Sequence, residues 1–313
     1  MAFNPQNLPS LSGKVYLVTG GNAGIGFHTV RHLALLGGRV YMGARSPQKA
    51  SDAIEKIRNE SSSADVHHLQ MDLMDLSSVV EAATSLKRRE NRLNGLVNNA
   101  GIMATDFAIS QADGFEAQWQ TNYLSHWLLT WHLLDLLRET ASEAEQDPGN
   151  ARVVNVTSNG HKAHPKGGID FDDINQEKGG AWSRYGMSKL GNVLHARQLN
   201  KLFGTGNHDA GKTAIWTASV HPGFIATDLN KQTIMPSFIY PTLKCLGVYQ
   251  EPDYGSYSSL FTVASTDFKE VDSGTYFDPG ARRGESNKTG TDMELADRLW
   301  TWTEGELRSR GLL

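Results

Sequence analysis

A tyrosine and a lysine stand four residues apart at Tyr185 and Lys189, in the run Tyr-Gly-Met-Ser-Lys. On a helix this spacing places both side chains on one face. A free tyrosine has a pKa of about 10, and a nearby ammonium group favours the phenolate, so the pair is suited to proton transfer. The same spacing also fits a partly buried tyrosine beside a surface lysine. Tyr240 and Lys244 repeat it, but without a preceding strand and with proline after the tyrosine, so we interpret Tyr240 as a substrate-loop or packing residue.

Two more polar residues precede this pair. Ser158 ends the apolar, β-branched run 152–157, and strand ends in open parallel sheets point at the ligand crevice. We therefore expect Ser158 to be able to hydrogen-bond a substrate oxygen alongside Tyr185. Asn122 falls inside a long helical pattern, where asparagine is a mediocre helix former. An exposed or capping position explains Asn122 as well as a functional one does.

Glycines follow the first predicted strand in the run Thr-Gly-Gly-Asn-Ala-Gly-Ile-Gly over 19–26, which then opens an amphipathic helix. Glycine allows the backbone to turn sharply and to approach a pyrophosphate, and the helix N-terminus offers free N–H groups to the phosphates. The alternative is a glycine-rich turn without a ligand, since Gly204 and Gly206 show that glycines also gather in other loops. Only the 19–26 run lies between a strand and a helix, so we predict a dinucleotide site.

The residue at the end of the second predicted strand selects the nucleotide. An acidic residue there would bind a ribose 2′-hydroxyl, whereas an arginine accommodates a 2′-phosphate. Arg45 occupies this position, Lys49 follows a turn later, and no Asp or Glu lies between residues 39 and 51. Arg45 is also compatible with a solvated surface position. We favour NADP(H).

The elements that must carry these residues alternate along the chain. Short β-branched runs predict strands over 14–19, 39–42, 66–70, 95–98, 152–157, 213–220 and 274–277. Helical patterns lie between and after them, over 24–36, 47–59, 76–89, 113–138, 183–203 and 292–308. This alternation predicts an α/β fold, a Rossmann-type doubly wound parallel β-sheet flanked by helices on both faces. We expect one domain over 1–313, with the nucleotide-binding half at about 14–157.

Two stretches do not fit the alternation. Residues 159–182 carry five glycines, and residues 229–253 carry three prolines among large apolar side chains. Loops of this length in compact domains are usually functional lids or surface excursions. The second stretch, a candidate substrate loop, fits a lipophilic substrate and ordinary packing equally well.

Composition excludes several classes of protein. The 313 residues include 30 Lys and Arg against 34 Asp and Glu, a formal charge of −4, so general attraction to nucleic acid is not expected. The single cysteine, Cys245, excludes a disulfide framework and multi-cysteine metal centres. No His, Asp and Glu set has a metal-ligand spacing, so no metal is predicted. His161 and His164 are candidates for substrate contact, whereas the other histidines look like surface or strand positions.

No run of 18 apolar residues occurs, and residues 1–13 lack the apolar region of a signal peptide. We therefore expect a cytoplasmic protein with no integral membrane segment.

Taken together, the motifs resemble the short-chain dehydrogenase/reductase family, in order and spacing, over about residues 12–230. They are the glycine run 19–26, Asn-Asn-Ala-Gly over 98–101, Asn122, Ser158, the Tyr185/Lys189 pair and Pro-Gly over 222–223. The segments 168–192, 273–277 and 295–300 resemble the retinol dehydrogenase-like and WW-domain oxidoreductase-like branch. Because an N-terminal anchor and WW modules are absent from this sequence, we expect a soluble form.

The resemblance implies roles for the catalytic candidates. Tyr185 would be the general acid/base, and Lys189 would lower its pKa and bind the nicotinamide ribose. Ser158 would orient the substrate oxygen. Asn122 would hold a water that links Lys189 to solvent.

The resemblance also implies contacts with NADP(H). Asp72 would lie near the adenine, Asn99 would support the central strand, and Ile225 and Thr227 would lie near the carboxamide and pyrophosphate. The full set of implied cofactor residues is Gly20, Asn22, Gly24, Ile25, Gly26, Arg45, Asp72, Leu73, Asn99, Ala100, Gly101, Tyr185, Lys189, Pro222, Gly223, Ile225 and Thr227.

The activity implied is hydride transfer between the nicotinamide and a carbonyl or alcohol group of a lipophilic small molecule, with reduction favoured. Two alternatives stay open: a non-redox NADP(H)-binding sensor or interaction protein, and a biosynthetic isomerase or cyclase on the same fold. Family members often dimerise or tetramerise through the helices expected over 113–138 and 183–203, which makes a homodimer one expected assembly.

Overall fold

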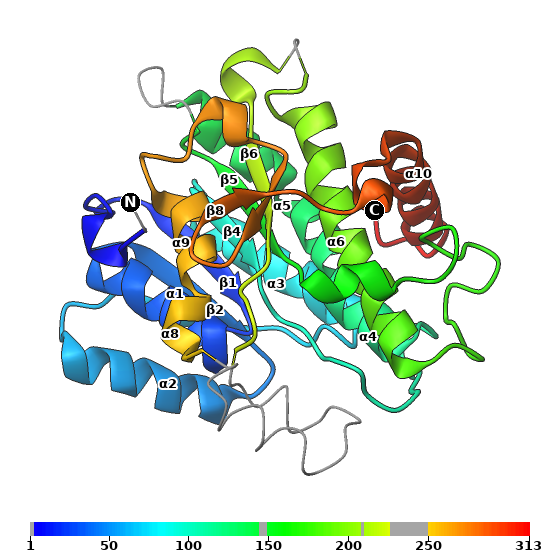
Figure 1. Cartoon of the computed structure of the whole chain (residues 1–313). Helices are drawn as coiled ribbons and strands as arrows, with labels where there is room; N and C mark the ends of the chain where they lie inside the picture. Colours follow the sequence, from blue (N-terminus) through cyan, green and yellow to red (C-terminus); the bar gives the residue numbers. More distant parts are fainter. Residues whose placement is uncertain (1–2, 144–148, 208–209, 226–249) are drawn as a thin grey trace.

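An eight-stranded sheet forms the centre of the computed structural model, which describes residues 3–143, 149–207, 210–225 and 250–313 (Figure 1). The strand order is β3-β2-β1-β4-β5-β6-β7-β8, in which β1 to β7 are parallel and β8 is antiparallel to β7. The strands are β1 (Val15–Thr19), β2 (Arg39–Ala44), β3 (Val66–Gln70), β4 (Gly95–Asn98), β5 (Arg152–Val156), β6 (Trp216–Val220), β7 (Thr275–Asp278) and β8 (Arg282–Gly284). The predicted doubly wound fold is confirmed.

Helices cover both faces of the sheet (Figure 1). One face carries α1 (Gly24–Leu35), α2 (Pro47–Glu60), α8 (Pro252–Gly255) and α9 (Tyr257–Ala264). The other carries α3 (Leu76–Arg89), α4 (Ala117–Trp119), α5 (Ser125–Ser142) and α6 (Ala181–Phe203), with α10 (Met293–Ser309) packed outside α6. None of these described helices is long and apolar enough to cross a bilayer.

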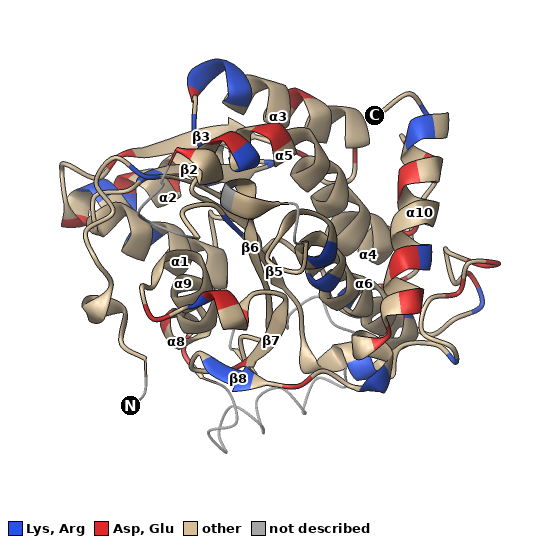
Figure 2. Cartoon of the chain, turned by 90° about the horizontal axis from the view of Figure 1, so that it is seen from above, with Lys and Arg blue, Asp and Glu red and all other residues tan. Residues whose placement is uncertain are grey.

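The central strands form because both of their faces are covered. Every residue of β1, β4, β5 and β6 is buried. Such strands read as continuous apolar runs rather than alternating ones. Charged residues lie instead on outer helices such as α10 and α3, and the middle of the sheet carries few (Figure 2).

The long helix expected over 113–138 begins later than its pattern predicts. Gly114 has a φ of +78°, which ends helical geometry there. The side chain of Glu116 caps the helix by accepting from the N–H of Trp119 at 2.8 Å. Between α4 and α5, residues Gln120–Leu124 form a π-helical turn. Asn122 lies in this turn, and π turns are frequent at functional sites.

Several elements carried no recognisable signal in the sequence. The short strand β8 and the helices α8 and α9 were not predicted. The strand expected over 213–220 begins only at Trp216, because Gly211–Thr213 form a 3-10 turn. Residues 229–249, most of the candidate substrate loop over 229–253, lie outside the described residues.

Aromatic side chains join α10 to the helices beneath it. The ring of Trp300 lies 4.9 Å from that of Trp127 on α5 and 6.0 Å from that of Phe203 on α6, measured between ring centroids. Trp131 stacks on Trp127 at 5.2 Å. The outer surface of α5 and α6 is therefore covered by the chain's own last helix.

We expect Trp300→Ala to lower the free energy of unfolding by about 3 kcal/mol or more, because it removes a buried indole from this cluster. Urea denaturation of the purified variant measures the loss. Trp182→Ala is the matched control, since 42% of the Trp182 side chain is exposed. Equal losses in the two variants would contradict the packing role of Trp300.

Candidate functional site

A cavity of about 530 Å³ opens where the carboxyl ends of β1, β2, β4 and β5 meet. It brings together residues from most of the sequence motifs. Its lining includes Gly20, Asn22, Gly24, Ile25, Gly26, Arg45, Asp72, Leu73, Asn99, Ala100, Gly101, Tyr185, Lys189 and Pro222. The position of the cavity agrees with the rule that open α/β sheets bind ligands at the carboxyl ends of their strands.

The glycine loop at one end of the cavity requires glycine at several positions, of which Gly20 and Gly26 show the two reasons. Gly20 has a φ of +63°, a conformation that L side chains rarely adopt. A Cβ on Gly26 would clash with the carbonyl oxygen of Gly20. In the described chain no side chain caps the start of α1, so its first N–H groups remain available to an anion. This cradle fits the pyrophosphate of a dinucleotide.

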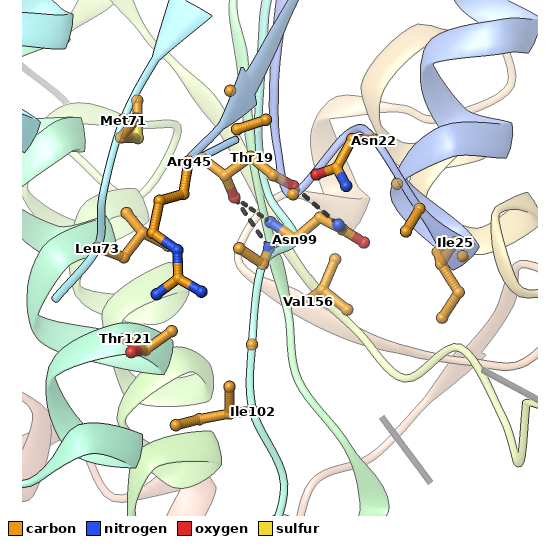
Figure 3. A pocket seen from close by; sticks show the side chains of 18 of the residues that line it. Thr19, Asn22, Ile25, Arg45, Met71, Leu73, Asn99, Ile102, Thr121 and Val156 are labelled. Atoms are coloured by element: carbon orange, nitrogen blue, oxygen red, sulfur yellow. Dashed lines mark hydrogen bonds between the residues drawn. The ribbon is translucent and has the colours of Figure 1, made fainter. Parts of the chain in front are cut away.

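Thr19 and Asn99 hold the loop to the sheet (Figure 3). The hydroxyl of Thr19 accepts from the N–H groups of Asn99 and Ala100, both at 2.9 Å. The side-chain amide of Asn99 donates to the carbonyl oxygen of Thr19 at 2.8 Å. These bonds fix the ends of β1 and β4 relative to each other.

Arg45 directly follows β2 at the opposite end of the cavity from Asn22 and Ile25 (Figure 3). Its side chain is 73% exposed, and its Nη1 lies 4.0 Å from Oδ2 of Asp72. The N-terminus of α2, capped by Ser46, begins two residues later. The guanidinium, the helix N-terminus and nearby Lys49 therefore form a positively polarised region that suits a phosphate group.

Tyr185 is buried on α6 beside the cavity, with its side chain hydrogen-bonded to Ser158. Burial raises the pKa of Tyr185 to about 12, and the bond with Ser158 acts in the opposite direction. Gly160 lies so close that a Cβ there would come within 2.8 Å of the tyrosine ring. The hydroxyl is therefore protonated at neutral pH and held in one place.

Lys189 lies one turn further along α6 and is only 4% exposed. Its Nζ donates to the carbonyl oxygen of Val156 at 3.1 Å, and the hydroxyl of Thr157 donates to the Lys189 carbonyl at 2.7 Å. Burial lowers the pKa of Lys189 to about 8. The ammonium lies 5.8 Å from the centroid of the Tyr185 ring. Burial is the largest influence on the pKa of Tyr185 in this structure, so the lowering by Lys189 that the resemblance implies stays a prediction for the protein with its cofactor bound.

Asn122 is fully buried behind the cavity, so the exposed or capping interpretation is wrong. Its Oδ1 accepts from the N–H of Ile102 at 2.8 Å, and its amide donates to the Ile102 carbonyl at 3.0 Å. The same amide donates to the hydroxyl of Ser188 at 2.9 Å. Asn122 thereby links the segment after β4 to the helix that carries Tyr185 and Lys189.

Some predicted residues lie outside the cavity lining. Ser158 and Asn122 contact residues next to it, and Gly223, with a φ of +101°, follows Pro222 at its edge. Ile225 is buried and packs beside Ile25, where a Cβ on Gly255 would meet both side chains. Thr227 and the second tyrosine–lysine copy lie outside the described residues.

Several residues of the cavity lining were not among the predicted site residues. Ile102, Thr121 and Val156 line the cavity. Of these, only Val156 carried a usable signal, because it lies near the end of the strand predicted over 152–157.

Two histidines also differ from expectation. His126 and His195 are fully buried on α5 and α6, rather than at surface or strand positions. His161 is buried as well, and its Nδ1 donates to the Ser158 carbonyl at 2.7 Å, so it contacts the backbone of the site.

Comparison with known sequences gives a consistent result. The family model described as short chain dehydrogenase matches residues 14–170. A short-chain dehydrogenase/reductase of Aspergillus calidoustus, drtF, is 61% identical over 99% of this chain and 98% of its own length. Retinol dehydrogenase 13 of Mus musculus is 34% identical over 93% of this chain and 83% of its own length.

Solved structures share the fold. An uncharacterized protein from Mycobacterium paratuberculosis superposes with a TM-score of 0.73 at 26% identity, covering 98% of each chain. An NADPH-bound carbonyl reductase from chicken fatty liver superposes with a TM-score of 0.62 at 22% identity, covering 88% of this chain and 99% of its own.

We expect Gly26→Ala to weaken dinucleotide binding at least tenfold, because the added methyl group displaces the Gly20 carbonyl from the cradle. Titration of nucleotide fluorescence measures the dissociation constant. Gly305→Ala in α10 is the matched control, since a Cβ there meets nothing within 4 Å. Wild-type affinity in Gly26→Ala would show that the loop does not hold the pyrophosphate.

Proposed function

The chain belongs to the short-chain dehydrogenase/reductase family, and we propose that it is an NADP(H)-dependent reductase of lipophilic carbonyl compounds. The resemblance drawn from the sequence is confirmed by the family match and by the similarity to a retinol dehydrogenase. Proteins of this family bind a nicotinamide cofactor and catalyse hydride transfer with small molecules. The finer assignments of cofactor, substrate and residue roles are our proposal.

One observation carries this proposal: a buried tyrosine, a buried lysine and a serine meet at the edge of the cavity. Tyr185 is hydrogen-bonded to Ser158, and Lys189 lies one turn away on the same helix. This intact set favours an enzyme over a nucleotide-binding sensor, because a sensor does not require a proton donor of this kind.

Tyr185, Ser158 and Lys189 each have a separate role in the proposed reduction. When bound, NADPH supplies the hydride. The protonated hydroxyl of Tyr185 donates its proton to the substrate oxygen, and the hydroxyl of Ser158 donates a hydrogen bond to the same oxygen. The ammonium of Lys189 stabilises the negative charge that develops on the tyrosine oxygen.

Support for NADP(H) comes from the end of β2. Arg45 and Lys49 provide positive charge there, and the residues between 39 and 51 include no carboxylate. Asp72 lies 4.0 Å from the guanidinium of Arg45 and helps to hold it over the cavity. A 2′-phosphate would take up the exposed face of this guanidinium.

Support for a lipophilic substrate comes from two exposed aromatic residues, one in contact with Tyr185 and one that follows Pro222 of the cavity lining. The ring of Trp182 meets that of Tyr185 edge-on at 6.0 Å and is 42% exposed. Phe224, two residues after Pro222, is 61% exposed. Exposed apolar side chains beside a cavity are typical of a site that binds apolar ligands.

The helices through which a homodimer was expected, α5 and α6, are covered by another helix of the same chain. The α10 helix packs on α5 and α6 through Trp300, Trp127 and Phe203. A homodimer through this face would require α10 to move away. We therefore propose that any homodimer of this protein uses another surface.

We expect Tyr185→Phe to lower kcat for carbonyl reduction by about 10² or more, since it removes the proton donor while it keeps the ring. The measurement is NADPH oxidation with a panel of ketones and aldehydes of increasing lipophilicity. NADPH affinity, measured separately, should stay within about twofold. Survival of turnover in this variant would contradict the assigned role. Tight NADPH binding without turnover of any compound by the wild-type protein would favour the sensor.

We expect Arg45→Asp to weaken NADPH binding by roughly tenfold or more, because a charge-assisted bond to the 2′-phosphate is replaced by repulsion. NADH binding should change far less. Lys56→Asp, on the exposed far part of α2, controls for the change in net charge. Equal weakening for both nucleotides would mean that Arg45 does not contact the phosphate.

A further inference from the structure

His126 has no part in the chemistry described above, yet it lies between the two halves of the site. It is fully buried in the first turn of α5, immediately after the π-helical turn that holds Asn122. Its two ring nitrogens contact groups that belong to different motifs.

The hydrogen bonds around Thr19 fix the protonation of this ring. The Thr19 hydroxyl already accepts from two N–H groups, those of Asn99 and Ala100. A hydroxyl has two acceptor sites and one hydrogen. That hydrogen must therefore go to Nε2 of His126, which lies 2.8 Å away.

The other nitrogen must carry the proton. Nδ1 of His126 lies 2.9 Å from the carbonyl oxygen of Asn122, which can only accept. The ring is therefore neutral, a donor at Nδ1 and an acceptor at Nε2. Its surroundings agree: burial lowers the pKa of His126 to about 4, and the charge of Lys189 on α6 acts in the same direction. His195 is the other titratable group on α6 that interacts with it.

Each end of the ring supports one half of the site. At Nε2, Thr19 joins the ends of β1 and β4 beneath the glycine loop. At the other side of the ring, Nδ1 donates to the Asn122 carbonyl. The Asn122 side chain is itself hydrogen-bonded to Ile102 and Ser188. A neutral histidine suits this position because it carries a donor and an acceptor on opposite sides of one rigid ring.

We propose that His126 is a positioning residue that ties the dinucleotide-binding strand ends to the Asn122 turn beside Tyr185 and Lys189. The use of NADPH as the ligand and the turnover part of this inference rest on the proposed function. The two hydrogen bonds have separate consequences: the bond to Thr19 serves nucleotide binding, and the bond to Asn122 serves catalysis.

Two amide substitutions separate these bonds. In His126→Asn the side-chain amide reaches the position of Nδ1 and can still donate to Asn122, but the Thr19 bond is lost. In His126→Gln the amide oxygen reaches the position of Nε2 and can still accept from Thr19, but the Asn122 bond is lost. Thr140→Val is the matched control, because Thr140 is also buried on α5, and its hydroxyl donates to the Leu136 carbonyl and accepts from the Leu93 N–H, away from both partners of His126.

The expected results are opposite for the two variants. His126→Asn should weaken NADPH binding about tenfold and leave kcat within about twofold. His126→Gln should lower kcat about tenfold and leave the affinity for NADPH within about twofold. Thr140→Val should lower the melting temperature and leave both quantities unchanged. All measurements are made well below the melting temperature of each variant.

A readout without turnover accompanies these measurements. NADPH affinity should fall above about pH 8 in the wild-type protein as Lys189 loses its proton. In His126→Gln the midpoint of this fall should rise, because a loosened Asn122 turn admits water to the lysine. In His126→Asn it should stay in place.

Equal changes of affinity and kcat in the two variants, or unchanged values with an unshifted midpoint, would overturn the positioning role. Absence of turnover in the wild-type protein would contradict the proposed function alone, because the affinities and the midpoint would still test His126.

Discussion

The burial of one ammonium group sets the conditions for the rest of this site. Lys189 is almost completely removed from water, and its Nζ donates a hydrogen bond to the carbonyl oxygen of Val156. Burying a charge is costly unless polar groups compensate it. That cost appears in the lowered pKa of Lys189, about 8. The fold must therefore keep the lysine in a fixed place, near the tyrosine, without a carboxylate that would neutralise it.

The ends of β5 and β4, together with α6 and the Asn122 turn, meet this requirement. The end of β5 supplies the Val156 carbonyl, which also accepts from the Asn192 amide at 3.1 Å. The segment after β4 approaches so closely that a Cβ on Gly101 would lie 3.2 Å from the lysine Nζ and 3.0 Å from Oδ1 of Asn122. The glycine loop and the tyrosine–lysine pair are thus parts of one connected set of buried polar groups rather than separate sites.

The sequence was sufficient for the features that depend on local patterning. The glycine run, the tyrosine–lysine spacing and the strand–helix alternation led to the fold and to most of the cavity lining. Features that depend on contacts between distant segments were missed. Asn122 read as a surface or capping residue because nothing nearby in the sequence shows that Ile102 and Ser188 pair with it. The start of α4 was misplaced because the apolar pattern extends past Gly114.

The central claim is that a buried Lys189 ammonium supports both cofactor binding and proton transfer. The most direct test is the pH dependence of kcat/KM for NADPH in the reductive direction, which reports groups in the free enzyme. The cation is present below a pKa of about 8 and is lost above it. We predict a plateau at neutral pH and a fall of about tenfold per pH unit above about pH 8. A plateau that continues to pH 10 would contradict the account.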